Sequence, residues 1–193
     1  MLTVKLFRYT KMLETPHLKL LPLTHDLLLK FIRDDHSLET ELNLKPSKGN
    51  ISPSLQQALE QSILPNVSNK DRDYLYHTLW IIVSKEFNRI VGDICFVGEP
   101  DQEGEIEIGY GIYPEFRARG YMTEAVAGII EWAKRQEKVK SIFAATAKEN
   151  IASYSILEKN NFVHIGEVDD MLSWKLELSK PECEEVLNSR VQV

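Results

Sequence analysis

The stretch Glu105–Thr123, EIEIGYGIYPEFRARGYMT, decides the fold. Its first half has the alternation of a β-strand that ends at Pro114, and its second half is a short basic loop that enters a helix at Gly120–Tyr121. The unpaired amides and the dipole of a helix N-terminus both favour negative charge. Arg117 and Arg119 add two cations to the loop. The stretch therefore predicts a binding site for a phosphorylated cofactor.

Two other phosphate-binding loops are excluded by their spacing. A Walker A loop needs two glycines followed by Lys and Ser/Thr, and no such run occurs in this chain. A dinucleotide fingerprint needs three glycines in G-x-G-x-x-G spacing. Gly109 and Gly111 begin that spacing, but Pro114 occupies the third position and both glycines lie inside the strand.

The loop Arg117-Ala118-Arg119-Gly120-Tyr121-Met122 resembles the pyrophosphate loop of GNAT-type N-acetyltransferases, Q/R-x-x-G-x-G/A. About thirty residues later, Asn150–Ser153 followed by Leu157–Lys159 and Phe162 resembles the N-x-x-S…EK-x-GF segment of that family. Glu14–Leu20 is similar to the opening strand of the Rim-type subgroup, which acetylates the N-termini of ribosomal proteins. The resemblance covers roughly residues 13–178, and the order of its three segments makes it specific.

The chain departs from the family pattern at two positions. Met122 stands where the family has a small residue, and the helical spacing of its apolar neighbours predicts that Met122 points into the core. Asn161 stands where the family has Gly before Phe162. Asparagine is the next best residue for a left-handed conformation after a helix, so we expect the same geometry there.

The pattern along the chain predicts a mixed α/β protein: a mostly antiparallel sheet flanked by helices, in a single domain over residues 1–193 with a core of about 13–178 and a polar tail at 180–193. The expected helices are one starting near Thr24, Ser54–Leu64 ended by Pro65, 121 to about 135, and Asn150–Asn160. The expected strands are His17–Leu23, 75–84, 89–97, 105–113, Ser141–Ala147, 162–168 and 171–178.

Composition sets the class of protein and its expected setting. The formal charge is −6 with a pI near 5.5, which argues against a nucleic-acid partner. No apolar run reaches the length of a membrane span, and residues 1–12 lack the apolar core of a signal peptide. The two cysteines, Cys95 and Cys183, are far apart, and the five histidines show no ligand spacing. We therefore expect a cytoplasmic protein with no bound metal and no membrane partner.

Glu107 is the candidate general base. Acetyl transfer to an amine requires that the amine lose its proton, and a carboxylate is the usual acceptor. Glu107 lies on the same strand face as Gly109 and Gly111, which leave open space for a ligand. The alternative interpretation is a solvated strand residue like Glu105.

Ser153 is the candidate for the leaving-group side. Several relatives have a tyrosine one helical turn later, which donates a proton to the sulfur, but Leu157 occupies that position here. The resemblance implies that Ser153 serves instead, with Tyr154 as the alternative. Asn150 is expected to cap the helix. The resemblance further implies that acetyl-CoA (coenzyme A) is held by Ile112, Arg117, Ala118, Arg119, Gly120, Tyr121, Met122, Thr123, Asn150 and Ser153.

The resemblance implies an enzyme that transfers acetyl from acetyl-CoA to a primary amine by direct attack in a ternary complex. A protein N-terminal α-amine is the acceptor of the Rim-type subgroup. Two alternatives stay open: acetylation of a small amine (a polyamine, an amino acid or an aminoglycoside), and a non-catalytic acyl-CoA-binding sensor. The identity of the acceptor and a possible homodimer are not fixed by the sequence.

Overall fold

The computed structural model describes residues 11–47 and 51–179. One sheet of eight strands runs through the described part, in the order β1-β2-β3-β4-β5-β6-β8-β7. The strands are β1 (Leu13–Glu14), β2 (Leu18–Pro22), β3 (Leu79–Ser84), β4 (Arg89–Phe96), β5 (Glu105–Ile112), β6 (Ser141–Ala147), β7 (Val163–Val168) and β8 (Met171–Glu177). The helices are α1 (His25–Arg33), α2 (Ser37–Leu42), α3 (Pro53–Ala58), α4 (Leu64–Val67), α5 (Tyr121–Lys134) and α6 (Ile151–Lys159). The predicted mixed, mostly antiparallel α/β fold is confirmed.

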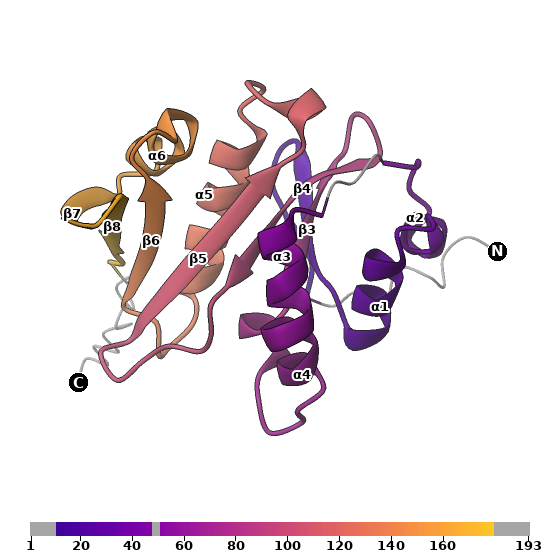
Figure 1. Cartoon of the computed structure of the whole chain (residues 1–193), viewed down its shortest axis with the longest axis horizontal. Helices are drawn as coiled ribbons and strands as arrows, with labels where there is room; N and C mark the ends of the chain where they lie inside the picture. The colour runs from indigo at the N-terminus through magenta and orange to yellow at the C-terminus, as the bar shows by residue number, and fades with distance from the viewer. Residues whose placement is uncertain (1–10, 48–50, 180–193) are drawn as a thin grey trace, which may run out of the picture.

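The sheet opens in its middle. Strands β1 to β5 pair antiparallel in sequence, and β6, β8 and β7 form a second antiparallel set. The two sets meet only where β5 pairs with β6 in parallel, at residues 105–107 with 141–143. Beyond Glu107 the two strands separate, and Figure 1 shows them diverging from their shared end. The gap leaves the last residues of β5 without a neighbour on the β6 side.

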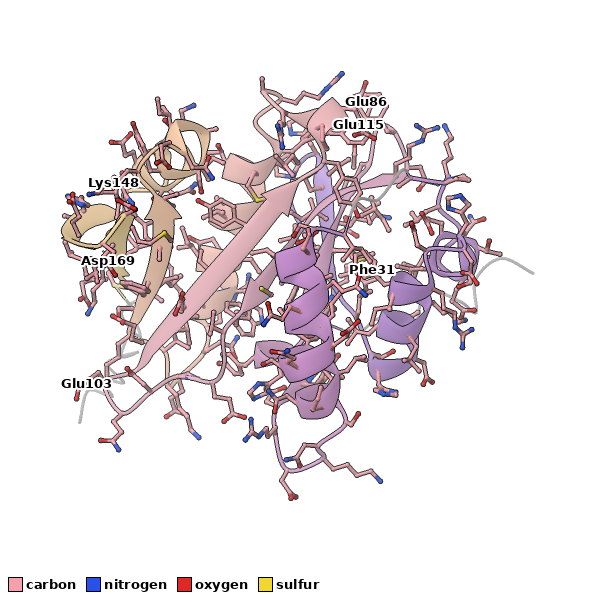
Figure 2. The ribbon with its side chains drawn as sticks, in the orientation of Figure 1. Phe31, Glu86, Glu103, Glu115, Lys148 and Asp169 are labelled. Atoms are coloured by element: carbon pink, nitrogen blue, oxygen red, sulfur yellow. The ribbon has the colours of Figure 1, made fainter. Side chains whose placement is uncertain are left out.

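Helices cover both faces of the sheet. Helix α5 lies behind β5, whereas α3 and α4 lie in front of β3 and β4, with α1 and α2 beside them (Figure 1). Trp132 of α5 packs against Phe96 of β4 with ring centroids 5.0 Å apart, and against Trp80 of β3 at 5.5 Å. Figure 2 shows Glu115 beyond the end of β5 and Glu103 before its start, so the loop after β5 lies at the opposite end of the sheet from the β4–β5 turn.

Several predicted elements differ from the observed ones. The helix predicted to stop at Pro65 continues to Val67, because a π-helical turn at Leu59–Ile63 precedes Pro65 and places the proline in the first turn of α4, where its missing N–H is not needed. The strand predicted from residue 75 begins at Leu79. Its first residues instead form a 3-10 turn, begun by Asp73, whose side chain accepts a hydrogen bond from the Leu75 amide.

Helix α2 was not predicted, since its six residues are too few to show a helical period. The predicted left-handed conformation of Asn161 is confirmed, with φ of 63°. Within the described residues no helix is long and apolar enough to cross a membrane. The predicted polar tail at 180–193 and most of the 1–12 segment lie outside the described residues.

Candidate active site

The loop between β5 and α5 turns twice through left-handed backbone. After a 3-10 turn at Pro114–Phe116, the chain has φ of 58° at Ala118 and 78° at Gly120. A Cβ on Gly120 would meet no atom within 4 Å, so backbone conformation, and not space, favours glycine there. Ala118 adopts the same region at a cost, which is typical of loops that present their backbone to a ligand.

The amides of this loop are free to bind an anion. No hydrogen bond within the described residues uses the backbone N–H groups from Ala118 to Thr123. Helix α5 begins at Tyr121, so its dipole adds partial positive charge at the same place. Consecutive free amides at a helix start are the arrangement that binds phosphate oxygens.

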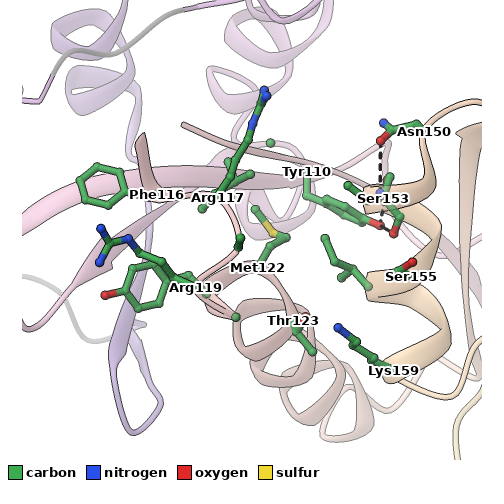
Figure 3. A pocket seen from close by; sticks show the side chains of 17 residues that line it. Tyr110, Phe116, Arg117, Arg119, Met122, Thr123, Asn150, Ser153, Ser155 and Lys159 are labelled. Atoms are coloured by element: carbon green, nitrogen blue, oxygen red, sulfur yellow. Dashed lines mark hydrogen bonds between the residues drawn. The ribbon is translucent and has the colours of Figure 1, made fainter. Parts of the chain in front are cut away.

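A cavity of about 730 Å³ extends from this loop into the gap between β5 and α6 (Figure 3). Its size is within the usual range for sites that hold a cofactor. The walls come from the end of β5, the loop, the first turn of α5 and one face of α6. The lining residues are Tyr110, Gly111, Ile112, Phe116, Arg117, Ala118, Arg119, Gly120, Tyr121, Met122, Thr123, Asn150, Ala152, Ser153, Ser155, Ile156 and Lys159. The structure therefore brings all ten residues predicted for cofactor binding to one cavity.

Three cations lie on the cavity wall of this acidic protein. Arg117 and Arg119 are exposed, and neither forms an ion pair with another described residue. The Arg119 guanidinium lies over the Phe87 ring, 5.3 Å from its centroid. Lys159 at the end of α6 is the third cation, and Figure 3 shows it across the cavity from the arginines. Lys159 belongs to the motif quoted above, but the sequence alone did not assign it to the site.

Met122 is almost fully buried, as predicted from the helix period, although its side chain also forms part of the cavity wall.

A hydrogen bond joins α6 to the start of α5: the Asn160 side-chain amide donates to the Thr123 backbone carbonyl at 3.2 Å. The two helices that supply opposite walls of the cavity are therefore held in register.

The predicted helix cap at Asn150 positions Ser153 in the first turn of α6. Oδ1 of Asn150 accepts a hydrogen bond from the Ser153 amide at 3.2 Å, which fixes the first turn of α6. The Ser153 hydroxyl donates to the Tyr110 hydroxyl at 3.1 Å, and that hydroxyl donates to the Ser153 carbonyl at 3.0 Å. Figure 3 shows this pair at the cavity wall. Burial raises the pKa of Tyr110, and the hydrogen bond to Ser153 partly opposes the rise.

Tyr110 is a site residue that the sequence reasoning missed, because its partner Ser153 lies 43 positions away. The tyrosine absent at Leu157 is replaced by a fully buried leucine. Tyr154, the alternative to Ser153, stacks on Trp174 with ring planes 15° apart and does not line the cavity.

Glu107 lies where β5 and β6 still pair and is not among the residues that line the cavity. Its side chain is on the face of the sheet opposite Tyr110, since the two positions differ by an odd number. Burial, and then the neighbouring Glu105 carboxylate, raise the pKa of Glu107. A raised pKa suits a proton acceptor, but no contact in the structure assigns this role. Within the described residues no group of three or more His, Cys, Asp or Glu could hold a metal ion.

Comparisons with known proteins give the same class as the geometry. Residues 18–163 match the family model for an acetyltransferase (GNAT) domain, so the chain belongs to that family and is an acyltransferase. It is 32% identical to the uncharacterized N-acetyltransferase YjdG of Bacillus subtilis over 155 residues, which cover 79% of this chain and 89% of the relative.

Solved structures share the fold. A RimL ribosomal L7/L12 α-N-protein acetyltransferase in complex with coenzyme A superposes with a TM-score of 0.64 at 13% identity, over 87% of this chain and 98% of the other. A ribosomal-protein-S5-alanine acetyltransferase from Vibrio fischeri gives 0.59 at 20% identity, over 86% and 96%. Microcin C7 self-immunity acetyltransferase MccE in complex with acetyl-CoA and AMP gives 0.59 at 17%, over 85% and 94%. The resemblance to GNAT enzymes of the Rim type is confirmed at the level of fold.

Proposed function

We propose that the protein transfers acetyl from acetyl-CoA to a primary amine by direct attack in a ternary complex. The observation that carries the proposal is the run of free backbone amides from Ala118 to Thr123. The cationic side chains of Arg117, Arg119 and Lys159 line the same cavity. These groups fit a pyrophosphate, because amides and cations neutralise its charge without any metal. The same cavity is also lined by Ser153 and the end of β5, where the acyl end of the cofactor is proposed to lie.

The chain's own residues cover each part of the reaction. Bound acetyl-CoA supplies the acetyl group as a thioester. Glu107 accepts the proton of the acceptor ammonium, through water because it lies outside the cavity wall. The neutral amine nitrogen would then form a bond to the acetyl carbonyl carbon as the carbon–sulfur bond breaks, and the second proton of the nitrogen would pass to the departing thiolate. The backbone amide of Ser153 donates to Asn150, and its hydroxyl, which donates to Tyr110 in this structure, turns to the departing sulfur and donates a hydrogen bond there.

A backbone N–H near Ile112 is proposed to stabilise the developing negative charge on the carbonyl oxygen. Ile112 lines the cavity at the end of β5, where the neighbouring strand has already separated. Gly92 of β4 lets the two backbones approach closely here, since a Cβ on it would lie only 2.3 Å from the Gly111 carbonyl oxygen. Rigid placement of such a donor is worth about 10²–10³-fold in rate in other enzymes.

A protein N-terminal α-amine is the first acceptor to test, because two of the similar structures are acetyltransferases of ribosomal proteins. Its pKa of about 7.7–8.0 makes it easier to deprotonate than a lysine amine, at about 10.4. The decisive experiment measures thiol release from acetyl-CoA with peptides that begin with Ser or Ala, with spermidine and with an aminoglycoside. Acceptor-dependent release supports the proposal. Tight binding of acetyl-CoA without release by any amine would indicate a sensor instead.

A further inference from the structure

A carboxylate lies on the opposite face of the sheet from α5, beside the cofactor cavity. Phe96 of β4 packs on Trp132 of α5, so residues of β4 at odd distances from Phe96 point to the other face. Asp93 is one of these. It is paired across the sheet with Ile81 of β3 on one side and with Gly111 of β5 on the other.

The neighbour on β3 is apolar and the carboxylate has no partner. Ile81 is fully buried, and Asp93 is partly buried next to it. Within the described residues the Asp93 carboxylate forms no hydrogen bond and no ion pair, and burial alone raises its pKa to about 7. A carboxylate withdrawn from water without a partner costs free energy, which a bound cation would offset.

The residue paired with Asp93 on β5, Gly111, has no side chain. A Cβ on Gly111 would lie 3.7 Å from Oδ1 of Asp93, and a Cβ on Gly109 would lie 3.6 Å from Sγ of Cys95. A side chain at either position would lie between the β4 side chains and the edge of β5 that faces away from β4. Because both residues are glycine, this space is open. That edge borders the gap left by β6, and the cofactor cavity reaches Gly111. Asp93 is thus separated from the cavity by the width of one strand, about 5 Å, which carries no side chain on this face at Gly109 and Gly111.

The titratable groups around Asp93 are acidic or neutral. Burial, and then Asp93 itself, raise the pKa of the Cys95 thiol to about 12, so the thiol is neutral. Tyr113, just after β5, also has a raised pKa: burial is the largest cause, followed by Asp93, Glu39, Asp34 and Glu115. These four carboxylates come from β4, α2, the end of α1 and the loop after β5. Their combined field favours a cation on this face.

We propose that Asp93 is the acceptor-binding residue, whose carboxylate receives the substrate's ammonium group on the surface formed by Gly109 and Gly111. The inference rests on the proposed acetyl transfer and names the substrate class: amines that arrive as cations. Asp93 holds the ammonium, whereas Glu107, four residues before Gly111 on the same face, accepts its proton. Asp93 must be ionised to bind the ammonium group, and acceptor affinity therefore rises with pH through about 7.

Binding is measured first, independently of turnover. Protein labelled with ¹⁵N and loaded with coenzyme A is titrated with the peptide Ser-Ala-Ala-Ala, with its N-acetylated form and with spermidine, while amide shifts are recorded. The free peptide or spermidine should shift the Gly109 and Gly111 amides, and the N-acetylated peptide should not. Asp93→Asn should weaken this binding at least tenfold at pH 8. The matched control Asp170→Asn, an exposed carboxylate in the β7–β8 turn, should bind like wild type.

Three further measurements separate an effect on folding from an effect on function. Asp93→Asn should keep its affinity for coenzyme A, and Asp93→Glu should partly restore acceptor binding. In turnover, Asp93→Asn should raise the acceptor KM at least tenfold with a smaller change in kcat. Equal acceptor affinity in Asp93→Asn and wild type, or no shift of Gly109 and Gly111 with either cation, would overturn the Asp93 site. Shifts at these glycines without thiol release would instead refute acetyl transfer and leave the cation site standing.

Discussion

Replacing Asp93 by asparagine should stabilise the protein, and by an amount that grows with pH. Asparagine has nearly the shape of a protonated aspartic acid and carries no charge at any pH. Burial raises the pKa of Asp93 from its ordinary value of 3.8 to about 7. Between these two values the folded protein binds more protons at this position than the unfolded chain does. The free energy of unfolding of the wild type therefore falls as pH rises through this window. The variant shows no such fall from this position, because asparagine does not titrate.

The magnitude follows from the two pKa values. Each pKa unit corresponds to about 1.36 kcal/mol, so the change from 3.8 to about 7 sets an upper limit of about 4 kcal/mol. The variant and the wild type should be nearly equal in stability near pH 4. Above pH 7 the variant should be more stable, by at most that limit. The difference should develop between these pH values and then stay constant.

Urea unfolding of both proteins at several pH values from 4 to 8 measures this difference directly. Asp170→Asn serves as the control, because its carboxylate is exposed and its replacement should add no pH-dependent difference. A free-energy difference between Asp93→Asn and wild type that does not change with pH would refute the reasoning. It would show that Asp93 is either solvated or paired in the folded protein.

Four further variants test the cofactor site and the chemistry. Arg117→Glu combined with Arg119→Glu should abolish measurable acetyl-CoA binding in calorimetry, since it places like charges beside the pyrophosphate; unchanged affinity would remove the main support for the cofactor site. Ser153→Ala should lower kcat about tenfold or more, equivalent to about 1.4 kcal/mol, with little change in cofactor affinity; equal kcat would exclude the serine. Tyr110→Phe should have a smaller effect of the same kind. Glu107→Gln should lower turnover by about 10²–10⁴-fold near neutral pH, with a loss that shrinks as pH rises and the amine deprotonates; a small loss that is independent of pH would make Glu107 a structural strand residue.

The parts of the site that the sequence could predict are local ones. The loop from Arg117 to Met122 and the cap at Asn150 are each contained in a few consecutive residues, and their physical requirements can be read from those residues alone. The positive φ at Gly120 and the hydrogen bond from the Ser153 amide to the Asn150 side chain follow directly from them. The burial of Met122 was likewise predictable, because it depends only on the period of one helix.

The parts that the sequence could not predict depend on pairing between distant strands or on short irregular turns. Asp93 and Tyr110 lie in ordinary β-strand sequence, and their positions beside Gly111 and Ser153 follow only from the strand register and the packing of α6. The continuation of the helix through Pro65 depends on a π-helical turn that no residue pattern marks. A search for polar residues opposite the glycines of the neighbouring strand would have been the one signal for Asp93.

Direct transfer of the acetyl group is the central claim, and its most direct test follows the group itself. The protein is mixed with acetyl-CoA and the peptide Ser-Ala-Ala-Ala or spermidine, and the masses of peptide, amine and protein are recorded together with the free thiol. The account predicts one acetylated amine for each thiol released, and no acetylated protein when the amine is omitted. Acetyl-CoA consumed without an acetylated amine, or an acetyl group found on the protein itself, would contradict it.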